Sequence, residues 1–427
     1  MKLIVDGYPV SEVGWGAGVS YSAGKLTLDR DEILTRLEET NSLTDVEITE
    51  FTLAEPDNET RINNIFDVLP AYVRLGEGVS TFPGFLGPMQ TVGSGHSAEL
   101  QNFSIIAISE FPRLFNKVMD KTGPGNDISP FRSHFHLAFS AKPTRDDMPL
   151  WEYHKALRRA GLVIGVYLAS IAARTTAPGR EIFELTKVSA GLPRAVFICQ
   201  LVALQYWNSG EPILYGNDLA NMIPTILHPN EFIDTGVIAC DFNLNIDTYS
   251  FQNNRIIKEL YRRHGKDLDF AGIIAVAAHV TREQREFSVQ MAVKLACDVL
   301  RADIAILTKV GGGIPESDVM MTIDGLEKRG VKTVGALWGH EGGSMNEVLT
   351  AFSPMANALV SVGLEDGRLK LPAIANVIGG MKIDFLRNNP EEGTVIQDAS
   401  GPLDVVYSNI CGAIDQLGAG RMMLKEY

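Results

Sequence analysis

The pattern of apolar and polar positions changes near residue 150, where short strands and turns give way to alternating helices and strands. Before that point, residues 2–10 and 19–28 suggest a hairpin, and residues 29–39 predict a helix with acidic residues in its first turn. Residues 45–54 alternate like a half-buried strand. The glycine- and proline-rich loop at 80–97 has the composition of a loop that wraps a neighbour or approaches a ligand closely.

Longer and more apolar elements follow residue 150. A helix is expected over 148–175, with a break at Gly161 or Gly165, and a buried strand is expected over 194–203. The apolar run at 161–173 is bounded by arginines and is too short to span a bilayer, so it is interpreted as part of a buried helix.

From residue 255 onward the rhythm of the elements is regular. Residues 255–263 predict a helix that ends at His264 and Gly265, a common C-terminal pattern. Beyond it the pattern predicts four apolar strands, at 270–278, 302–310, 331–339 and 358–363, separated by helices at about 282–300, 316–329 and 345–352. Continuous apolar strands alternating with helices indicate a parallel sheet that is covered on both faces.

These patterns predict an α/β protein with a strand-rich N-terminal region followed by a doubly wound parallel sheet. A chain of 427 residues is long enough for two or three domains. The expected divisions are a strand- and loop-rich domain over 1–150, an α/β middle segment over 151–239, and a Rossmann-like domain over 240–427.

Composition excludes some functions. Hydrophobic residues make up 45% and charged residues 21% of the chain, which is typical of a soluble globular protein. The formal net charge of -14 argues against nucleic acid as a partner, because phosphate binding needs basic residues. The first residues lack an apolar stretch of signal-peptide length, and no membrane association is expected. A cytoplasmic location is predicted.

The four cysteines lie far apart and match no metal or disulfide framework. Cys240 differs from the others because it closes an apolar β-type run at 232–241 and is followed at once by Asp241, in a polar, turn-forming segment. A lone cysteine is most often a small buried hydrophobe, and the composition alone favours that interpretation.

Two further places could carry chemistry at the carboxyl ends of the expected parallel strands. Gly311, Gly312 and Gly313 lie between a strand and a helix, where backbone amides could bind an anion such as phosphate. A tight strand-to-helix turn is the competing interpretation, and no nucleotide is expected because neither phosphate-loop motif is present. His340 and Glu341 end another strand at the same edge and are candidates for the rim of a site.

Histidines suggest weaker alternatives. His134 and His136 would point to one face of a strand as a possible metal pair, but no third ligand is indicated by spacing, and no metal is expected. His96 lies in the glycine-rich loop, where it is either a functional group or an exposed polar residue.

Three carboxamides, Gln252, Asn253 and Asn254, directly precede the helix at 255–263. An asparagine at that place is first of all an N-cap. Because Cys240 lies in the same polar segment, this cap could also support the chemistry of the cysteine.

Residues 215–274 resemble the α/β proprotein of component B of the clostridial glycine/sarcosine/betaine reductases. The most specific stretches are "PTILHP", "QNN" and "LYRRHGKDL", and residues 82–95 and 153–168 match as well. The similarity is collinear over most of the chain and weakens after about residue 300.

This resemblance implies an oxidoreductase subunit that takes part in reductive cleavage of the C–N bond of a small amino acid or N-methylated derivative. It implies self-cleavage between Ala239 and Cys240, with Cys240 as precursor of a pyruvoyl group whose ketone would react with an amine substrate. Asp241, Asn243, Tyr249 and His264 would support Cys240, together with the three carboxamides and His96. The implied partners are a selenocysteine- or cysteine-containing component B subunit and a carboxymethyl-accepting selenoprotein, so a hetero-oligomer is expected.

The sequence departs from the family at the junction. In the family an asparagine usually precedes the processed cysteine, and a second cysteine follows it, whereas here Ala239 precedes Cys240 and residues 241–247 contain no cysteine. Two alternatives therefore stay open. One is an unprocessed, non-catalytic paralogue that acts as a scaffold for a thiol- or selenol-bearing partner, and the other is a metal-dependent enzyme that uses His134 and His136. The choice among glycine, sarcosine and betaine is not encoded in any feature of this chain.

Overall fold

The computed structural model describes residues 1–111, 117–188, 191–204, 211–239, 246–311, 313–339, 353–364, 367–386 and 394–414. The expected site residues Cys240, Asp241, Asn243, Gly312, His340 and Glu341, and the helix expected at 345–352, lie outside these ranges.

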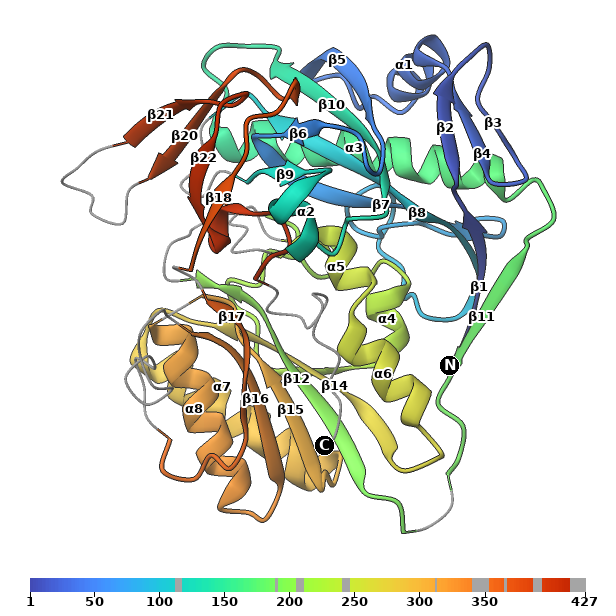
Figure 1. The fold of residues 1–427 in the computed structure, drawn as a ribbon. Helices are drawn as coiled ribbons and strands as arrows, with labels where there is room; N and C mark the ends of the chain where they lie inside the picture. The colour runs from blue at the N-terminus through green and yellow to red at the C-terminus, as the bar shows by residue number, and fades with distance from the viewer. Residues whose placement is uncertain are drawn as a thin grey trace.

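A mixed sheet organises the N-terminal part of the chain (Figure 1). Its strands follow the order β11-β1-β8-β10-β5, and β7 pairs with β8. The long strand β8 pairs in parallel with β1 through its first half and with β10 through its second half, while β7 runs antiparallel along it. The bounds are Lys2–Pro9 (β1), Val46–Ala54 (β5), Ile65–Leu75 (β7), Gly95–Ser109 (β8), Phe135–Pro143 (β10) and Gly179–Glu184 (β11).

Helix α3, Leu150–Ala172, packs on this sheet and is continuous, so the break expected at Gly161 or Gly165 is wrong. These glycines instead let the helix approach β7. A Cβ at Gly161 would lie 2.3 Å from Cδ1 of Leu69, and one at Gly165 would lie 2.4 Å from the carbonyl oxygen of Pro70. The apolar run at 161–173 is confirmed as part of a buried helix.

Smaller elements surround this sheet. The hairpin expected between residues 2–10 and 19–28 is wrong, because β1 pairs with β8 and β11, and the second stretch folds on itself. The helix expected at 29–39 is confirmed as α1, which Asp29 caps. The bounds are Glu12–Trp15 (β2), Ser20–Ser22 (β3), Lys25–Leu28 (β4), Arg30–Glu39 (α1), Thr60–Ile62 (β6), Met119–Asp120 (β9) and Gly123–Ile128 (α2).

Segments from the C-terminal part of the chain return to the N-terminal sheet. Strand β19 pairs with β6, and the buried Arg61 donates to the backbone carbonyls of Ala399 and Gly401 while it is paired with Asp120. These contacts cross the expected domain boundaries, which stay a prediction. The bounds are Arg368–Leu371 (β18), Asn376–Ile378 (β19), Lys382–Leu386 (β20), Thr394–Asp398 (β21), Leu403–Val406 (β22) and Tyr407–Asn409 (η4).

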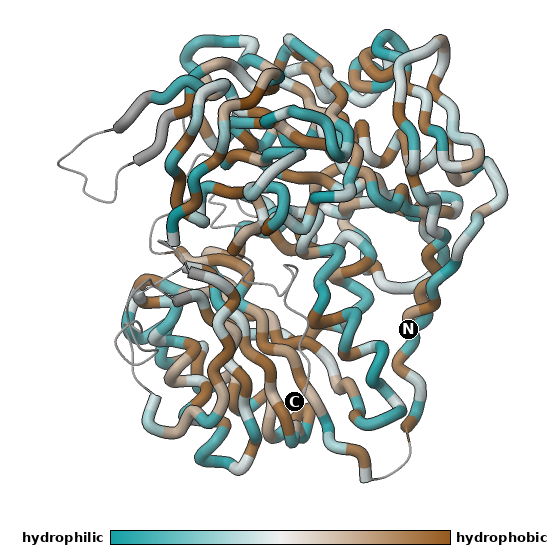
Figure 2. The backbone as a smooth tube through the Cα atoms, viewed as in Figure 1, coloured by the Kyte–Doolittle hydropathy of each residue, from teal (hydrophilic) through white to brown (hydrophobic). Residues whose placement is uncertain are grey.

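The second large sheet has the order β13-β14-β12-β15-β16-β17, and every pairing in it except β13–β14 is parallel. Its strands carry the continuous hydrophobic colour expected of buried parallel strands (Figure 2). The bounds are Arg194–Ala203 (β12), Thr225–Leu227 (β13), Asp269–Ala278 (β14), Ile304–Thr308 (β15), Lys332–Gly339 (β16) and Leu359–Leu364 (β17).

Helices cover this sheet. One core cluster joins Val196 and Ile274 to side chains of α7 and α8, and another joins Phe197 and Ile273 to α6. Because alternate strand residues point to opposite faces, these helices lie on opposite sides of the sheet. The bounds are Pro229–Ile233 (α4), Thr248–Gln252 (α5), Arg255–Arg263 (α6), Arg282–Lys294 (α7), Leu295–Val299 (η2) and Ile314–Glu327 (α8).

The predicted mixed α/β class is confirmed, and the strands predicted at 194–203, 270–278, 302–310, 331–339 and 358–363 correspond to β12, β14, β15, β16 and β17. The finer description as a doubly wound, Rossmann-like domain stays a prediction. Among the described residues, no helix is both long enough and apolar enough to cross a bilayer.

Candidate functional site

Ala239 is the last described residue before Cys240, and it is 1% exposed. The β-type structure expected over 232–241 is wrong for the first half of this run, because Phe232 and Ile233 are the last residues of helix α4. Within the described part of this run, Val237 forms a bridge, to Leu214. The chain therefore reaches the expected junction from a helix and a turn.

The turn before the junction is tied to the N-terminal sheet by the carboxylate of Asp234. Its Oδ1 accepts hydrogen bonds from the hydroxyls of Tyr72 and Ser97, both at 2.9 Å. Its Oδ2 accepts from the backbone amide of Gly93 at 2.6 Å and pairs with the Arg74 guanidinium at 2.9 Å. A carboxylate with this many partners fixes the backbone that leads to Ala239.

The glycine-rich loop at 80–97 wraps this same segment. A Cβ at Gly84 would lie 2.2 Å from the carbonyl oxygen of Tyr215, and one at Gly93 would lie 3.0 Å from Cβ of Asn230. The expectation that the loop wraps a neighbour is confirmed, and its glycines are needed because two backbones approach each other closely.

Ala239 itself is held by a hydrogen bond to α5. Its backbone amide donates to Oγ1 of Thr248 at 3.1 Å. Thr248 in turn donates to Asp67 twice, from Oγ1 to Oδ2 at 2.7 Å and from its backbone amide to Oδ1 at 2.9 Å. The backbone of Ala239, one peptide unit before the link that the resemblance marks for cleavage, is thus connected through Thr248 to a buried carboxylate.

Asp67 belongs to a buried charged network. Arg158 of α3 donates from Nε to Oδ2 of Asp67 at 2.8 Å and from Nη1 to Oε1 of Glu211 at 3.3 Å. The side chains of all three residues are at most 1% exposed. The Arg158 guanidinium also lies over the ring of Phe66, 4.7 Å from its centroid. Charges buried this deeply occur only when they are paired and hydrogen-bonded.

Sequence reasoning missed this network. Asp67 stands inside a strand whose other residues up to Val73 are also buried, and Arg158 lies in the buried face of α3. A charged residue inside an apolar strand or on the apolar face of a helix was the signal that could have found both.

The expected carboxamides lie at the break between α5 and α6. Asn254 accepts from the backbone amide of Ile257 at 3.1 Å, which confirms its N-cap role, and Asn253 accepts from Nζ of Lys258 at 2.8 Å. Gln252 is buried, and neither polar atom of its amide has a partner among the described residues. Tyr249 packs against His134 with ring centroids 5.1 Å apart. Burial raises the pKa of the Tyr249 hydroxyl.

His264 and His96 lie elsewhere. His264 follows the last turn of α6, where its Nε2 bonds the carbonyl oxygen of Thr186 at 2.9 Å and its Nδ1 accepts from the amide of Phe270 at 3.1 Å. The length of α6 separates it from the three carboxamides. The expectation that His96 lies in the glycine-rich loop is wrong, because His96 is the second residue of β8, where its backbone pairs with β1 and β7. Its side chain pairs with Asp6 at 2.8 Å, and the Arg180 guanidinium hydrogen-bonded to Asp6 lowers the pKa of that carboxyl.

Gly311 and Gly313 follow β15, as expected for a strand-to-helix turn. Glu316, in the first turn of α8, is buried against Lys309, whose ammonium lies 4.4 Å from the centre of the Trp338 ring. A carboxylate therefore already occupies the start of this helix, and an anion would have to bind beside it. The anion site stays a prediction.

His134 and His136 do face the same way, with ring centroids 6.0 Å apart. Both nitrogens of His136 have protein partners, Ser104 at 2.8 Å and Nζ of Lys121 at 3.2 Å. Within the described ranges, no group of three or more His, Cys, Asp or Glu residues is arranged to hold a metal ion. The histidine pair thus gives no support to a metal-dependent enzyme.

Burial makes two of the other cysteines poor nucleophiles. It raises the pKa of the Cys199 thiol to about 12 and that of Cys411 well above its usual range. Cys297 is partly exposed, and burial raises its pKa as well.

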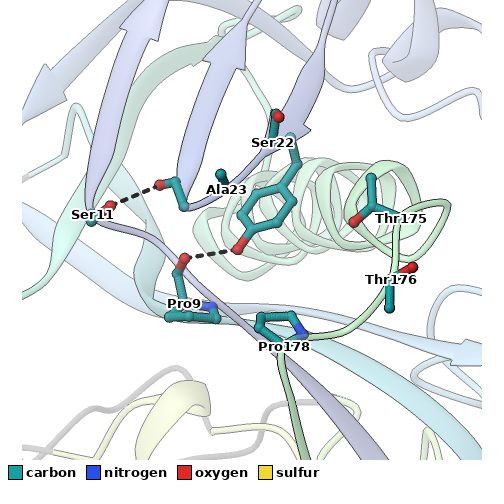
Figure 3. Close-up of a pocket in the computed structure, with 9 residues that line it drawn as sticks. Pro9, Ser11, Ser22, Ala23, Thr175, Thr176 and Pro178 are labelled. Carbon is teal, nitrogen blue, oxygen red and sulfur yellow. Dashed lines mark hydrogen bonds between the residues drawn. The ribbon is translucent and has the colours of Figure 1, made fainter.

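A cavity of about 420 Å³ lies between the end of β1, strand β3 with the turn that follows it, and the segment after α3 (Figure 3). It is lined by prolines, hydroxyl residues and Tyr21, and none of the described residues that line it is charged. Two of its hydroxyls already donate to backbone carbonyls, Tyr21 to Pro9 at 2.8 Å and Ser11 to Gly24 at 3.3 Å. Its described lining therefore offers no carboxylate, imidazole or amine for acid–base catalysis.

Comparison with known proteins agrees with the resemblance. Residues 1–425 match the family described as glycine/sarcosine/betaine reductase component B subunits. The chain is 27% identical over 443 residues to "Glycine reductase complex component B subunits alpha and beta" of Acetoanaerobium sticklandii, with all of both chains covered. It is 28% identical over 399 residues to "Betaine reductase complex component B subunit alpha" of Peptoclostridium acidaminophilum, with 90% of this chain and 88% of that one covered. No solved structure matches. Because the family match spans nearly the whole chain, the protein belongs to the family of glycine/sarcosine/betaine reductase component B subunits.

Proposed function

We propose that this chain is the substrate-binding subunit of a glycine/sarcosine/betaine reductase-type complex, an oxidoreductase that cleaves the C–N bond of a small amino acid or N-methylated derivative. We further propose that it cuts its own peptide link between Ala239 and Cys240 and that Cys240 becomes a pyruvoyl group. Family membership supports the first part, and the hydrogen bond that holds Ala239 supports the second.

The cut needs only the chain and water. The Cys240 thiol attacks the carbonyl carbon of Ala239, the peptide C–N bond breaks, and a thioester and a free amine form. Elimination of the sulfur with the Cα proton leaves a thiocarboxylate on Ala239 and an enamine on residue 240. Tautomerisation and hydrolysis then consume one water and release ammonia, so that a ketone remains.

The surroundings of Ala239 fit this chemistry. The Ala239 N–H is fixed through Thr248 to Asp67, which limits the movement of the residue whose carbonyl would be attacked. The carboxylate of Asp67, with Thr248 as intermediary, is also a group through which a proton can move in a site shielded from water. When bound at residue 240, a pyruvoyl group supplies an electrophilic carbonyl for the substrate amine.

The partners follow from the same proposal. A thiol or selenol on a second component B subunit would take the carbon fragment, and a carboxymethyl-accepting selenoprotein would receive it. The chain would therefore act in a hetero-oligomer, and a cytoplasmic location stays a prediction.

Denaturing electrophoresis with intact mass tests the cleavage. The proposal predicts pieces of 239 and 188 residues in the purified chain and a single full-length species in Cys240→Ala. Cys297→Ala is a matched control, because Cys297 is a partly exposed free cysteine on η2, away from the junction. Full-length wild-type chain that still supports turnover with its partners would contradict the pyruvoyl part of the proposal.

A specific observation favours a second candidate. Alanine replaces the usual asparagine before Cys240, and residues 241–247 contain no second cysteine. This second candidate is a non-catalytic paralogue that acts as a scaffold. A chain that stays uncut, and that binds a thiol- or selenol-bearing partner without supporting turnover, would identify this protein as such a paralogue.

A further inference from the structure

Several buried polar atoms near the junction have no hydrogen-bond partner in the described part of the chain. Gln252 is 2% exposed, and both Oε1 and Nε2 of its amide are unpartnered there. Nδ2 of Asn254 and Nδ1 of the buried His134 are unpartnered as well. A buried polar group that is left without a partner is destabilising, and native proteins tolerate few of them. When the protein supplies no partner, such a group is satisfied by a bound water or by a polar ligand.

These residues surround Tyr249. The ring of His134 meets the ring of Tyr249 edge-on, with centroids 5.1 Å apart. Gln252 follows Tyr249 by three residues and Thr248 by four in α5, so its side chain leaves the helix between theirs. Thr248 contacts Ala239 and Tyr249 contacts His134, so the Gln252 side chain leaves α5 on the face of the helix that meets both residues.

A positive charge with no counter-ion among the described residues lies beside them. Arg255, the first residue of α6, is exposed and makes no ion pair or hydrogen bond with the described residues. Burial is the main cause that lowers the pKa of His134, and the Lys121 and Arg255 charges lower it further. Burial also raises the pKa of Tyr249, an effect to which the Glu99 and Asp247 charges add and which the Arg255 charge opposes.

The other nearby charges have partners. The Lys121 ammonium is bonded to the carbonyls of Phe131 and His134, each at 2.8 Å. The Asp247 carboxylate accepts two hydrogen bonds from Ser250. Of these described charges, Arg255 is thus the cation that is available to an anion at this place.

We propose that Gln252, His134 and Arg255 form a site for the carboxylate of a short amino acid. Nε2 of Gln252 and an N–H of the neutral His134 ring donate to the carboxylate, and the Arg255 guanidinium neutralises its charge. Oε1 of Gln252 is left to accept an N–H from the substrate amine. The choice of ligand rests on the proposed function, whereas the site rests on the unpartnered buried atoms of Gln252 and His134 and on the positive charge of Arg255.

Binding of propionate to the full-length chain, followed by ligand-observed NMR, tests the site. Propionate carries the carboxylate but no amine, and propionamide has nearly the same shape without the charge. We expect saturable binding of propionate and at least about ten-fold weaker binding of propionamide. Arg255→Met should weaken propionate binding about ten-fold, because a charge-assisted contact is lost. Arg174→Met is the matched control, since Arg174 is also exposed and makes no ion pair with the described residues.

Gln252→Met separates binding from a structural role. Removing a buried amide that has no partner should raise the melting temperature of the free chain while propionate binding weakens. Absent or charge-independent binding, unchanged affinity in Arg255→Met, or a lower melting temperature with unchanged affinity in Gln252→Met would each overturn the inference.

The outcome is independent of self-cleavage. Propionate cannot react with a ketone, so an uncut chain that binds it through Arg255 would retain this site while the pyruvoyl proposal fails. A cut chain that does not bind propionate would overturn the site and leave the cleavage proposal intact.

Discussion

The Thr248 hydroxyl is the most informative single group to remove, because it connects the expected cleavage site to the buried carboxylate of Asp67. Thr248→Val keeps the shape of the side chain. It leaves the buried amide of Ala239 without a partner, which costs about 1–3 kcal/mol, and it removes a hydrogen bond to a charged group, worth about 1.5–3 kcal/mol. The expected loss of unfolding free energy is therefore about 2.5–6 kcal/mol, measured by urea unfolding in an uncut Cys240→Ala background.

The effect on cleavage should be larger than a loss of stability explains. A displacement of about 1 Å at a reacting group can slow a reaction about a hundred-fold, so we expect self-cleavage in Thr248→Val to be slowed at least ten-fold. Thr248→Ser should restore it, since serine retains the hydroxyl. The measurement is the fraction of cut chain against time, followed by denaturing electrophoresis.

Thr333 provides the control, because it repeats this arrangement far along the chain. Its backbone amide and Oγ1 both donate to Oε1 of Glu327, each at 2.7 Å. Thr333→Val should lower stability by about 1–3 kcal/mol without slowing the cut. Equal cleavage rates in wild type and Thr248→Val, or an equal slowing in Thr333→Val, would refute the role given to Thr248.

Two further predictions concern the fold around the site. Burial, with Lys121 and Arg255 nearby, lowers the pKa of His134 from 6.5 to about 3, so its contribution to stability is complete above pH 6.5 and is lost as the pH falls toward 3. When the pH is lowered from 7 to 5, the unfolding free energy of the wild type, measured with urea, should fall by about 2 kcal/mol more than that of His134→Gln. A difference between the two proteins that does not change with pH would show that the His134 ring is not held neutral. Gly165→Ala would bring a Cβ to 2.4 Å from the Pro70 carbonyl oxygen, so it should lower the unfolding free energy by about 1–3 kcal/mol. Gly14→Ala is the control, because Gly14 has open space around it, and it should change the unfolding free energy by less than about 1 kcal/mol. Equal effects of the two substitutions would contradict the packing described for α3.

Local periodicity predicted much of the fold. The strand over 194–203 has the predicted bounds because it is a continuous run of buried apolar residues. The helix over 255–263 has the predicted bounds because it is amphipathic and begins at a clear N-cap. Pairing between distant segments was not predictable in this way. Strand β1 pairs with β8, some 90 residues later, and nothing in its own sequence distinguishes that partner from the nearby stretch at 19–28.

The site was predictable only in part. Thr248 and Asp67 are separated by 181 positions, so their contact depends on the packing of α5 against β7 and not on any local pattern. Asn254 was predictable as an N-cap because that role is local. Gln252 was identified as a polar neighbour of Asn254, but its lack of partners among the described residues is visible only once the surrounding side chains are placed.

The central claim is that the chain breaks its own backbone before Cys240 and leaves a ketone there. Intact mass of the purified full-length product, before and after treatment with a hydrazine-type carbonyl reagent, tests it most directly. We predict two pieces, with the 188-residue piece alone gaining the mass of the reagent. A single unlabelled chain of full mass, with turnover preserved in Cys240→Ala, would contradict it.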